Sequence, residues 1–199
     1  MNLGGFANCS FEKNGEQIAY DICPVNIVLN HYAEKLGQDF DDGGKLAASG
    51  KVNEELLQKL NKLSFYAEKP PKSLGLEWVK EHIFPLLDAY GISSEDVLRT
   101  FTEHIAVQLA HQFSDTSTSL STSASVLITG GGAYNSFLIE RLKKLASVEV
   151  VIPSPDIVEY KEALIFGLLG VLKIRDEVNC LASVTGALKN HSSGKIFYP

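Results

Sequence analysis

Two glycine-rich segments, far apart in the sequence, constrain the fold of this chain more than any other feature. The first, Asn2-Leu3-Gly4-Gly5-Phe6-Ala7-Asn8, opens the chain, and the second is Ile128-Thr129-Gly130-Gly131-Gly132-Ala133-Tyr134-Asn135. Gly5 and Gly130 are 125 positions apart. Each segment joins an apolar run to a new element, and backbone without Cβ atoms lets N–H groups approach a phosphate closely. Two such turns in one domain favour an ATP cleft.

The composition is typical of a soluble globular protein, and we expect one domain over residues 1–199. Apolar residues make up 45% of the chain and charged residues 21%. No apolar run reaches the ~18 residues of a membrane helix, so we expect no membrane partner. The net charge of −6 argues against nucleic acid, because phosphate contacts need a basic surface. The net charge does not exclude ATP, since backbone amides and Mg²⁺ supply positive potential.

The three cysteines, Cys9, Cys23 and Cys180, are odd in number and lack metal-ligand spacing. We interpret them as small buried thiols in a reducing compartment, which predicts a cytoplasmic protein.

The first half of the chain predicts a β-hairpin followed by helices. Asn14-Gly15 separates two runs with strand-like alternation, residues 2–9 and 16–23, and Asn-Gly is a strong hairpin signal. Apolar residues then recur at helical spacing over 26–36, 53–63, 75–90 and 93–113, with Pro85 expected to interrupt the third helix.

The second half predicts a β-α-β-α unit. After a Ser/Thr-rich segment, 114–125, interpreted as a surface loop, the pattern predicts a buried strand over 125–129, the glycine turn, and a helix over 135–146. A second strand over 148–152 would lie parallel to the first, joined by a right-handed crossover. A helix then runs from Asp156 to about Arg175, and its apolar part, Ala163 to Ile174, is expected to be buried.

Hairpin, helices and then β-α-β-α is the element order of the ribonuclease-H-like domain in the actin, sugar-kinase and heat-shock ATPase superfamily. We therefore expect an α/β fold of this actin-like ATPase type, with a mixed sheet that opens with a hairpin and is flanked by helices.

Seven stretches, in order, resemble the C-terminal domain of the 1,6-anhydro-N-acetylmuramic acid kinase family. They are residues 2–8, 20–26, 40–50, 70–73, 130–135, 162–163 and 183–187. The resemblance implies phosphorylation of the 6-hydroxyl of an anhydro amino sugar by ATP and Mg²⁺. In the same reaction water opens the 1,6-anhydro ring at C1, as part of peptidoglycan recycling. One stretch departs from the family: where it commonly has Asp-Thr-Gly-Pro-Gly-Asn, this chain has Asp21-Ile22-Cys23-Pro24-Val25-Asn26.

Family members are roughly twice as long as this chain. The resemblance therefore implies a partner, the N-terminal half, which carries the first phosphate loop and the catalytic aspartate. We expect this chain to be the C-terminal half of a two-domain kinase and to be inactive alone.

The resemblance also assigns roles to the glycines. Gly4 and Gly5 would set backbone amides against the ATP phosphates, against the alternative of a plain β-turn. Gly130, Gly131 and Gly132 would lie under the adenosine, against the alternative of tight helix–strand packing. Asn135 either caps the following helix or contacts the nucleotide, and the cap is favoured.

Three polar side chains complete the predicted site. Asp21 would orient Mg²⁺ through water, or close an Asx turn. Asn26 would contact the substrate, or cap a helix. Glu162 would face the sugar and the attacking water as the catalytic residue of this half, or only favour a helix N-terminus.

Two other functions remain open. The chain belongs to a kinase for a different amino sugar, or it is a non-catalytic nucleotide-binding or dimerising module. The second reading predicts an apolar surface and a homodimer.

Overall fold

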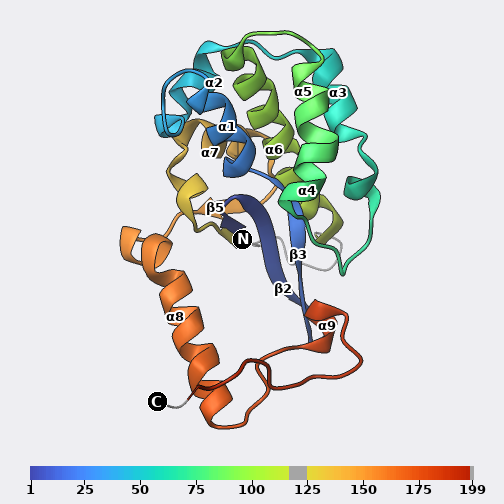
Figure 1. Ribbon diagram of the computed structural model, residues 1–199, viewed down its shortest axis with the longest axis vertical. Coiled ribbons are helices and arrows are strands. Elements are labelled where there is room, and N and C mark those ends of the chain that lie inside the picture. The colour runs from blue at the N-terminus through green and yellow to red at the C-terminus, as the bar shows by residue number, and fades with distance from the viewer. Residues whose placement is uncertain (117–124, 198–199) are drawn as a thin grey trace.

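Five strands form the sheet beneath the helices in the computed structural model, which describes residues 1–116 and 125–197 (Figure 1). Strands β1 (Asn2–Leu3), β2 (Phe6–Lys13) and β3 (Glu16–Pro24) are antiparallel neighbours. Strands β4 (Ser125–Leu127) and β5 (Glu149–Val151) form a parallel pair. The expected α/β fold is therefore confirmed.

The predicted hairpin is present and turns at the predicted residues. Strands β2 and β3 pair from Phe6 opposite Pro24 to Lys13 opposite Glu16. Asn14 and Gly15 make the turn with φ angles of 54° and 82°. Positive φ at both central residues matches the right-handed twist of the flanking strands.

The two groups of strands meet where β1 lies beside β4. Asn2 and Thr129 form a parallel bridge, and the Leu3 N–H donates to the Thr129 carbonyl at 2.7 Å. The strand order across the sheet is thus β3-β2-β1-β4-β5. The expected buried strand over 125–129 is only partly correct: Ile128 and Thr129 are buried, whereas Leu127 is 47% exposed.

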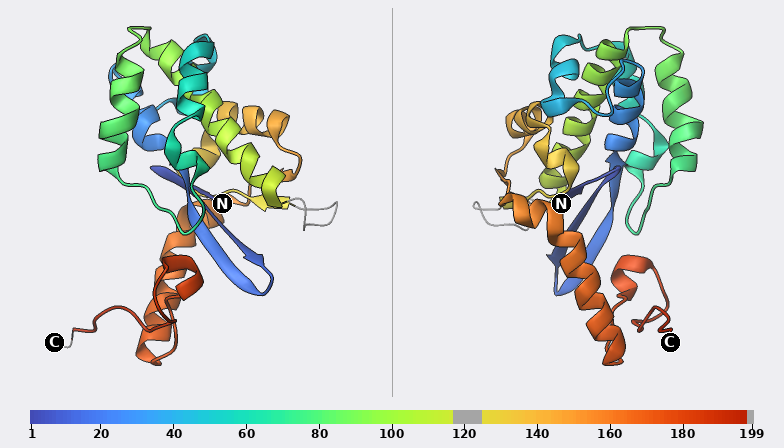
Figure 2. Two further views of the ribbon diagram at one scale, coloured as in Figure 1. Left: turned by 90° about the vertical axis from the view of Figure 1, so that its right-hand side faces the viewer. Right: turned by 60° about the vertical axis from the view of Figure 1, so that its left-hand side comes forward.

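The helices α1 to α7 cover the sheet on one side (Figures 1 and 2). Their bounds are α1 Asn26–Glu34, α2 Lys45–Ser49, α3 Glu54–Asn61, α4 Leu76–Trp78, α5 Phe84–Asp88, α6 Ser94–Thr116 and α7 Ser136–Leu145. Short 3₁₀ turns span Asp42–Gly44, Ser64–Ala67 and Gly131–Tyr134. Helix α6 continues into the predicted Ser/Thr-rich loop, the rest of which, 117–124, lies outside the described residues.

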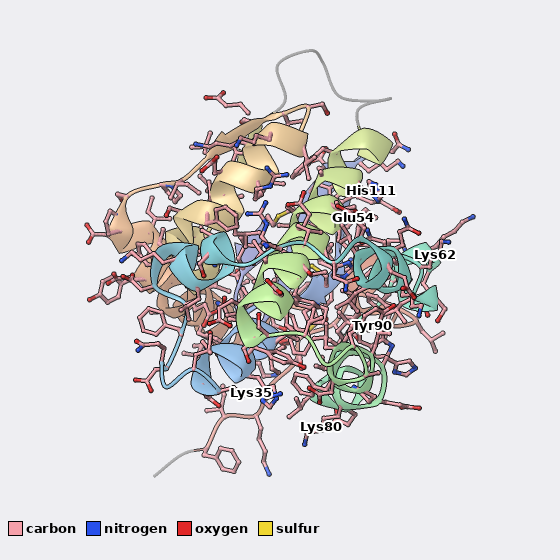
Figure 3. All side chains as sticks on the ribbon, turned by 90° about the horizontal axis from the view of Figure 1, so that it is seen from above. Lys35, Glu54, Lys62, Lys80, Tyr90 and His111 are labelled. Carbon is pink, nitrogen blue, oxygen red and sulfur yellow. The ribbon has the colours of Figure 1, made fainter. Side chains whose placement is uncertain are left out.

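Helix α6 is the centre of the helical layer. Its predicted stripe, Val97, Phe101, Ile105, Leu109 and Phe113, is buried in the core. Ser93 caps the helix, since its Oγ accepts the Asp96 N–H at 3.2 Å. Figure 3 shows side chains filling the space around α6, with the labelled, exposed Lys62 and Lys80 at the rim.

Pro85 distorts its helix, as predicted, but without a break. A π turn, Val79–Ile83, links α4 to α5, and the Phe84 N–H donates to the Val79 carbonyl. A proline ring collides with the carbonyl four residues earlier and brings no N–H of its own. The wider π turn absorbs that conflict.

A buried histidine is held in a polar cluster between α3 and α6. The Asn61 Oδ1 lies 2.6 Å from His104 Nδ1 and also accepts from the Gln108 amide. The Tyr66 hydroxyl lies 2.9 Å from His104 Nε2. Burial lowers the pKa of His104 to about 3. His104 is therefore neutral in the folded chain at neutral pH.

This histidine predicts an acid-sensitive fold. Below the ordinary histidine pKa of about 6.5 the unfolded chain takes up a proton that the folded chain does not, so stability falls as the pH drops toward 3. We expect His104 to cost about 2 kcal/mol of unfolding free energy between pH 6.5 and pH 5. Urea denaturation at both pH values measures it, and the His104→Gln variant should lose this part of the pH dependence.

The apolar part of helix α8 (Pro155–Ile174) is not buried, contrary to the prediction. The helix has the expected length, but it extends away from the helical layer (Figure 2), and of its side chains only Val158 is buried. Leu164, Phe166 and Ile174 are 75%, 70% and 76% exposed. The apolar run was correctly identified as helix, but the described residues do not cover it. A helix that is apolar on all sides is normally buried.

The last described segment folds back toward the hairpin. Helix α9 (Ala182–Thr185) lies near β3, and a Cβ at Gly186 would be 3.3 Å from Pro71 Cγ. Cys9 and Cys23 are buried as predicted, whereas Cys180 is half-exposed. Among the described helices none has the length and apolar character to cross a bilayer.

Candidate functional site

The fold brings the two glycine turns side by side. Gly4 directly follows β1, and Gly130 follows Thr129, which pairs with β1 in parallel. Parallel strands place their carboxyl ends at one edge of a sheet, and ligands bind outside that edge in open α/β sheets. The two turns, 125 residues apart in the sequence, therefore lie at one place in the structure.

Packing within the chain requires glycine at two of the three consecutive positions, Gly130 and Gly132. Gly130 has a φ of 83°, and a Cβ there would lie 2.8 Å from both the Leu3 carbonyl oxygen and Asn2 Oδ1. At the buried Gly132 a Cβ would lie 2.7 Å from Leu3 Cβ. Close packing against β1 thus explains these two glycines without a ligand.

The remaining glycines have open space around them. A Cβ at the exposed Gly131 would meet nothing closer than Asn26 Nδ2 at 3.6 Å. At Gly5 the nearest atom is Ile27 Cβ at 3.9 Å, and at Gly4 it is Asn2 Nδ2 at 3.4 Å. None of the three has a positive φ. Packing does not require glycine at these positions, so they leave room for a bound group.

The first turn offers fewer amides than the sequence suggested. The Gly4 N–H donates to the Phe6 carbonyl at 3.1 Å, so it is not free for a phosphate. The carbonyls of Gly4 and Gly5 accept from Asn26 and Val25 at the start of α1, at 3.2 and 2.8 Å. Within the described residues the Gly5 N–H has no such internal bond. Gly5 is therefore the amide that this turn presents.

A pocket of about 320 Å³ opens beside Gly131. Its walls come from α1, the 39–44 loop and the second glycine turn: Asn26, Leu29, Asn30, Phe40, Asp41, Asp42, Gly43, Gly131, Tyr134 and Asn135. Phe40 and Tyr134 are 58% and 49% exposed. Two aromatic rings, apolar wall and a few amides suit a flat ring with polar edges.

Some polar groups that line this pocket already form hydrogen bonds within the protein. Both carboxylate oxygens of the buried Asp41 accept backbone N–H groups of α2, from Leu46 at 2.7 Å and Ala47 at 2.9 Å. Asp41 therefore holds the first turn of α2.

A second hollow, of about 680 Å³, lies on the other side of α1. Gly5, Lys80 and Phe84 line it, and it shares Asn26 and Asn30 with the first pocket. Asn26, predicted as a substrate contact or a cap, forms no side-chain cap on α1. Its side chain instead borders both hollows.

Asn135 caps α7, the alternative that the sequence favoured. Its Oδ1 accepts the Leu138 N–H at 3.0 Å. We expect Asn135→Ala to lower the free energy of unfolding by about 1 kcal/mol. Asn135→Asp should keep the cap and the stability. Thermal melts compare the two, and equal losses in both variants would contradict a capping role.

Asp21, on strand β3, forms hydrogen bonds with the loop that contains Lys72 and Leu74. Its Oδ2 accepts the Leu74 N–H at 2.8 Å, and its own N–H donates to the Lys72 carbonyl at 3.2 Å. In the described ranges no three His, Cys, Asp or Glu side chains are grouped to hold a metal ion. One carboxylate with an engaged oxygen does not by itself make a magnesium site.

Glu162 is exposed on α8. Its apolar neighbours Ala163 and Leu164 are exposed too, so Glu162 is not a buried carboxylate that needs a partner. The preceding residue, Lys161, makes the contact that the sequence analysis missed. Its Nζ donates to Asn2 Oδ1 at 2.8 Å and to Thr129 Oγ1 at 2.7 Å. Burial lowers the pKa of Lys161.

Comparison with known proteins identifies the family. The family model described as anhydro-N-acetylmuramic acid kinase matches residues 1–199. The chain belongs to the anhydro-N-acetylmuramic acid kinase family. The resemblance inferred from seven short stretches is thereby confirmed.

Curated relatives of the anhydro-N-acetylmuramic acid kinase family extend well beyond this chain. Those from Vibrio parahaemolyticus and Francisella tularensis subsp. novicida are both 34% identical to it, over 99% and 98% of its length. One from Variovorax paradoxus is 35% identical over 99%. These matches cover 54%, 54% and 55% of the relatives. The chain thus spans about half the length of the relatives it matches.

Proposed function

We propose that this chain is the ATP-binding half of an anhydro-sugar kinase, with an actin-like, ribonuclease-H-like fold. The observation that carries the proposal is the meeting of two glycine turns beside one pocket. Gly131 would lie under the adenosine, between the Phe40 and Tyr134 rings, and the Gly5 amide would meet the phosphates. The hairpin, helices and β-α-β-α order supports the fold assignment.

The proposed reaction is the one that the family resemblance implies. ATP would phosphorylate the 6-hydroxyl of the anhydro amino sugar, and water would open the 1,6-anhydro ring. Phosphoryl transfer depends mainly on holding the reacting groups in line and stabilising charge. This half would hold the donor, with Asn26 and Glu162 reaching toward the sugar. The general base would come from the other half, and Mg²⁺ would be bound chiefly by the phosphates. ATP as the donor makes the cytoplasm the proposed location.

The exposed part of α8 supports the need for a second half. Its side chains Leu164, Phe166 and Leu168 are more than half exposed, although a helix apolar on all sides is expected to be covered. We propose that the additional half present in the relatives covers this helix. In the absence of that half, the same exposed face should make the chain associate with itself. The exposed face is therefore the observation that favours the alternative, a dimerising module.

Nucleotide binding tests the proposal. Mg-ATP is titrated by calorimetry into the chain and into Gly131→Val, whose added side chain points into open space and should leave the melting temperature unchanged. We expect binding to the chain and a loss of at least tenfold in the variant, since a close approach to the backbone is blocked. No binding, or equal binding to both, would overturn the adenosine site.

Kinase assays test the proposal that each half supplies only part of the catalytic machinery. The chain alone should not phosphorylate anhydro-N-acetylmuramic acid. Addition of the remaining part of the Vibrio parahaemolyticus relative should give turnover. A panel of amino sugars in the same assay distinguishes the anhydro sugar from other acceptors, and turnover by the chain alone would contradict the two-half mechanism.

A further inference from the structure

Asn2 opens the first glycine-rich segment, and its side chain lies between Gly4 of the first turn and Gly130 of the second. Its Oδ1 lies 2.8 Å from the position of a Cβ on Gly130, and its Nδ2 lies 3.4 Å from that of Gly4. The side-chain amide therefore spans the gap, with its carbonyl end at the second turn and its NH₂ end at the first. The side chain is half-buried.

The orientation of this amide is determined by Lys161. The ammonium group has three donors and no acceptor, so the atom 2.8 Å from Lys161 Nζ has to be the Asn2 oxygen. The single proton of the Thr129 hydroxyl is shared between this oxygen, at 3.3 Å, and the Met1 carbonyl, at 3.4 Å. The NH₂ end is thereby directed to the Gly4 side. Over the described residues, no protein acceptor is bonded to it.

Lys161 contributes charge as well as orientation. Its two bonded partners, Asn2 and Thr129, are neutral. Glu162, the next residue, is exposed and acts on Lys161 through its charge, but among the described residues it makes no ion-pair contact with the ammonium group. A cation with neutral partners at the carboxyl edge of β1 and β4 leaves positive potential where an anion would bind.

We propose that Asn2 is a phosphate-binding residue of this site and that Lys161 is the positioning residue that aims its amide. This inference rests on the proposed function and adds two residues to it. The Asn2 N–H groups and the Gly5 amide would bind the phosphate chain from one side. Adenosine, which has no phosphate, would not use Asn2.

The test is Asn2→Asp, which keeps the oxygen that Lys161 binds but replaces the NH₂ donor with a second, negatively charged oxygen. Mg-ATP and adenosine are titrated separately by calorimetry, and melting temperatures are recorded. We expect Mg-ATP to bind at least about tenfold more weakly, because a charge-assisted hydrogen bond is lost and repulsion added. Adenosine affinity and melting temperature should be unchanged.

Lys161→Met tests the positioning role, with Lys173→Met farther along α8 as the control that removes the same charge elsewhere. We expect the first to weaken Mg-ATP but not adenosine, and the second to change neither. Wild-type affinity of Asn2→Asp for Mg-ATP, or an equal loss of adenosine, would overturn the inference. If the unmodified chain binds adenosine but not Mg-ATP, the inference fails while the adenosine site stands. If it binds neither, the proposed function fails first.

Discussion

Gly130→Ala is expected to destabilise the fold by about 3 kcal/mol, whereas Gly131→Ala one residue later should change stability by less than about 0.5 kcal/mol. An alanine in place of Gly130 would lower the stability of the fold for two reasons. The φ of 83° and ψ of 167° of Gly130 lie in a region that only glycine populates readily, and a side chain there costs roughly 1–3 kcal/mol. The Cβ would also lie 2.8 Å from the Leu3 carbonyl oxygen, which is backbone of β1 and cannot rotate away.

The neighbouring glycines give this prediction its controls. Gly132→Ala should cost about 1–3 kcal/mol through its 2.7 Å approach to Leu3 Cβ, without a backbone penalty. Gly131 has neither problem, and alanine there also restricts the unfolded chain. Urea denaturation of the three variants measures the differences. Equal losses at all three positions would contradict the division between packing glycines and ligand-facing glycines.

The second large effect concerns α8. Replacing Leu164 and Leu168 together with lysine should abolish self-association of the chain without lowering its melting temperature. Both side chains are more than half exposed, so the folded chain loses no core contact. Each leucine contributes roughly 2 kcal/mol when covered, and both chains of a dimer carry the change, so the dissociation constant should rise by at least about a thousandfold. Sedimentation velocity over a concentration series measures it.

The matched control places the same substitution where the side chain is buried. Leu138 on α7 is fully buried, and Leu138→Lys should prevent folding because an unpaired charge would enter the core. An unmodified chain that stays monomeric at every concentration would contradict an apolar docking face. A double variant with a markedly lower melting temperature would show instead that α8 packs within its own chain.

Local signals predicted the parts of the fold that depend on neighbouring residues. The Asn14-Gly15 turn needs only two consecutive residues with positive φ, and the stripe from Val97 to Phe113 needs only helical periodicity. The extent of α8 was predictable for the same reason. Its exposure was not, since periodicity reports that a face is apolar and says nothing of what covers it.

The candidate site was predictable only in outline. The glycine segments were identified, yet the sequence could not separate Gly130 and Gly132 from Gly131, because Leu3 makes that distinction from the far end of the chain. Lys161 and Asn2 are 159 positions apart and carry no pairing signal in a single sequence. The bond from the Gly4 N–H to the Phe6 carbonyl was not predictable either, because it depends on the geometry of a tight turn.

The bridge between Asn2 and Thr129 also bears on how fast the chain folds and unfolds. The hairpin and α6 form through short-range contacts, whereas the β1–β4 pairing has to close a loop of more than a hundred residues, and such pairings are slow. We therefore expect the glycine turns to come together after the folding transition state. Gly132→Ala should then mainly speed unfolding and leave the refolding rate nearly unchanged. A nucleotide bound across both turns would slow unfolding, and would protect the chain kinetically while it is occupied.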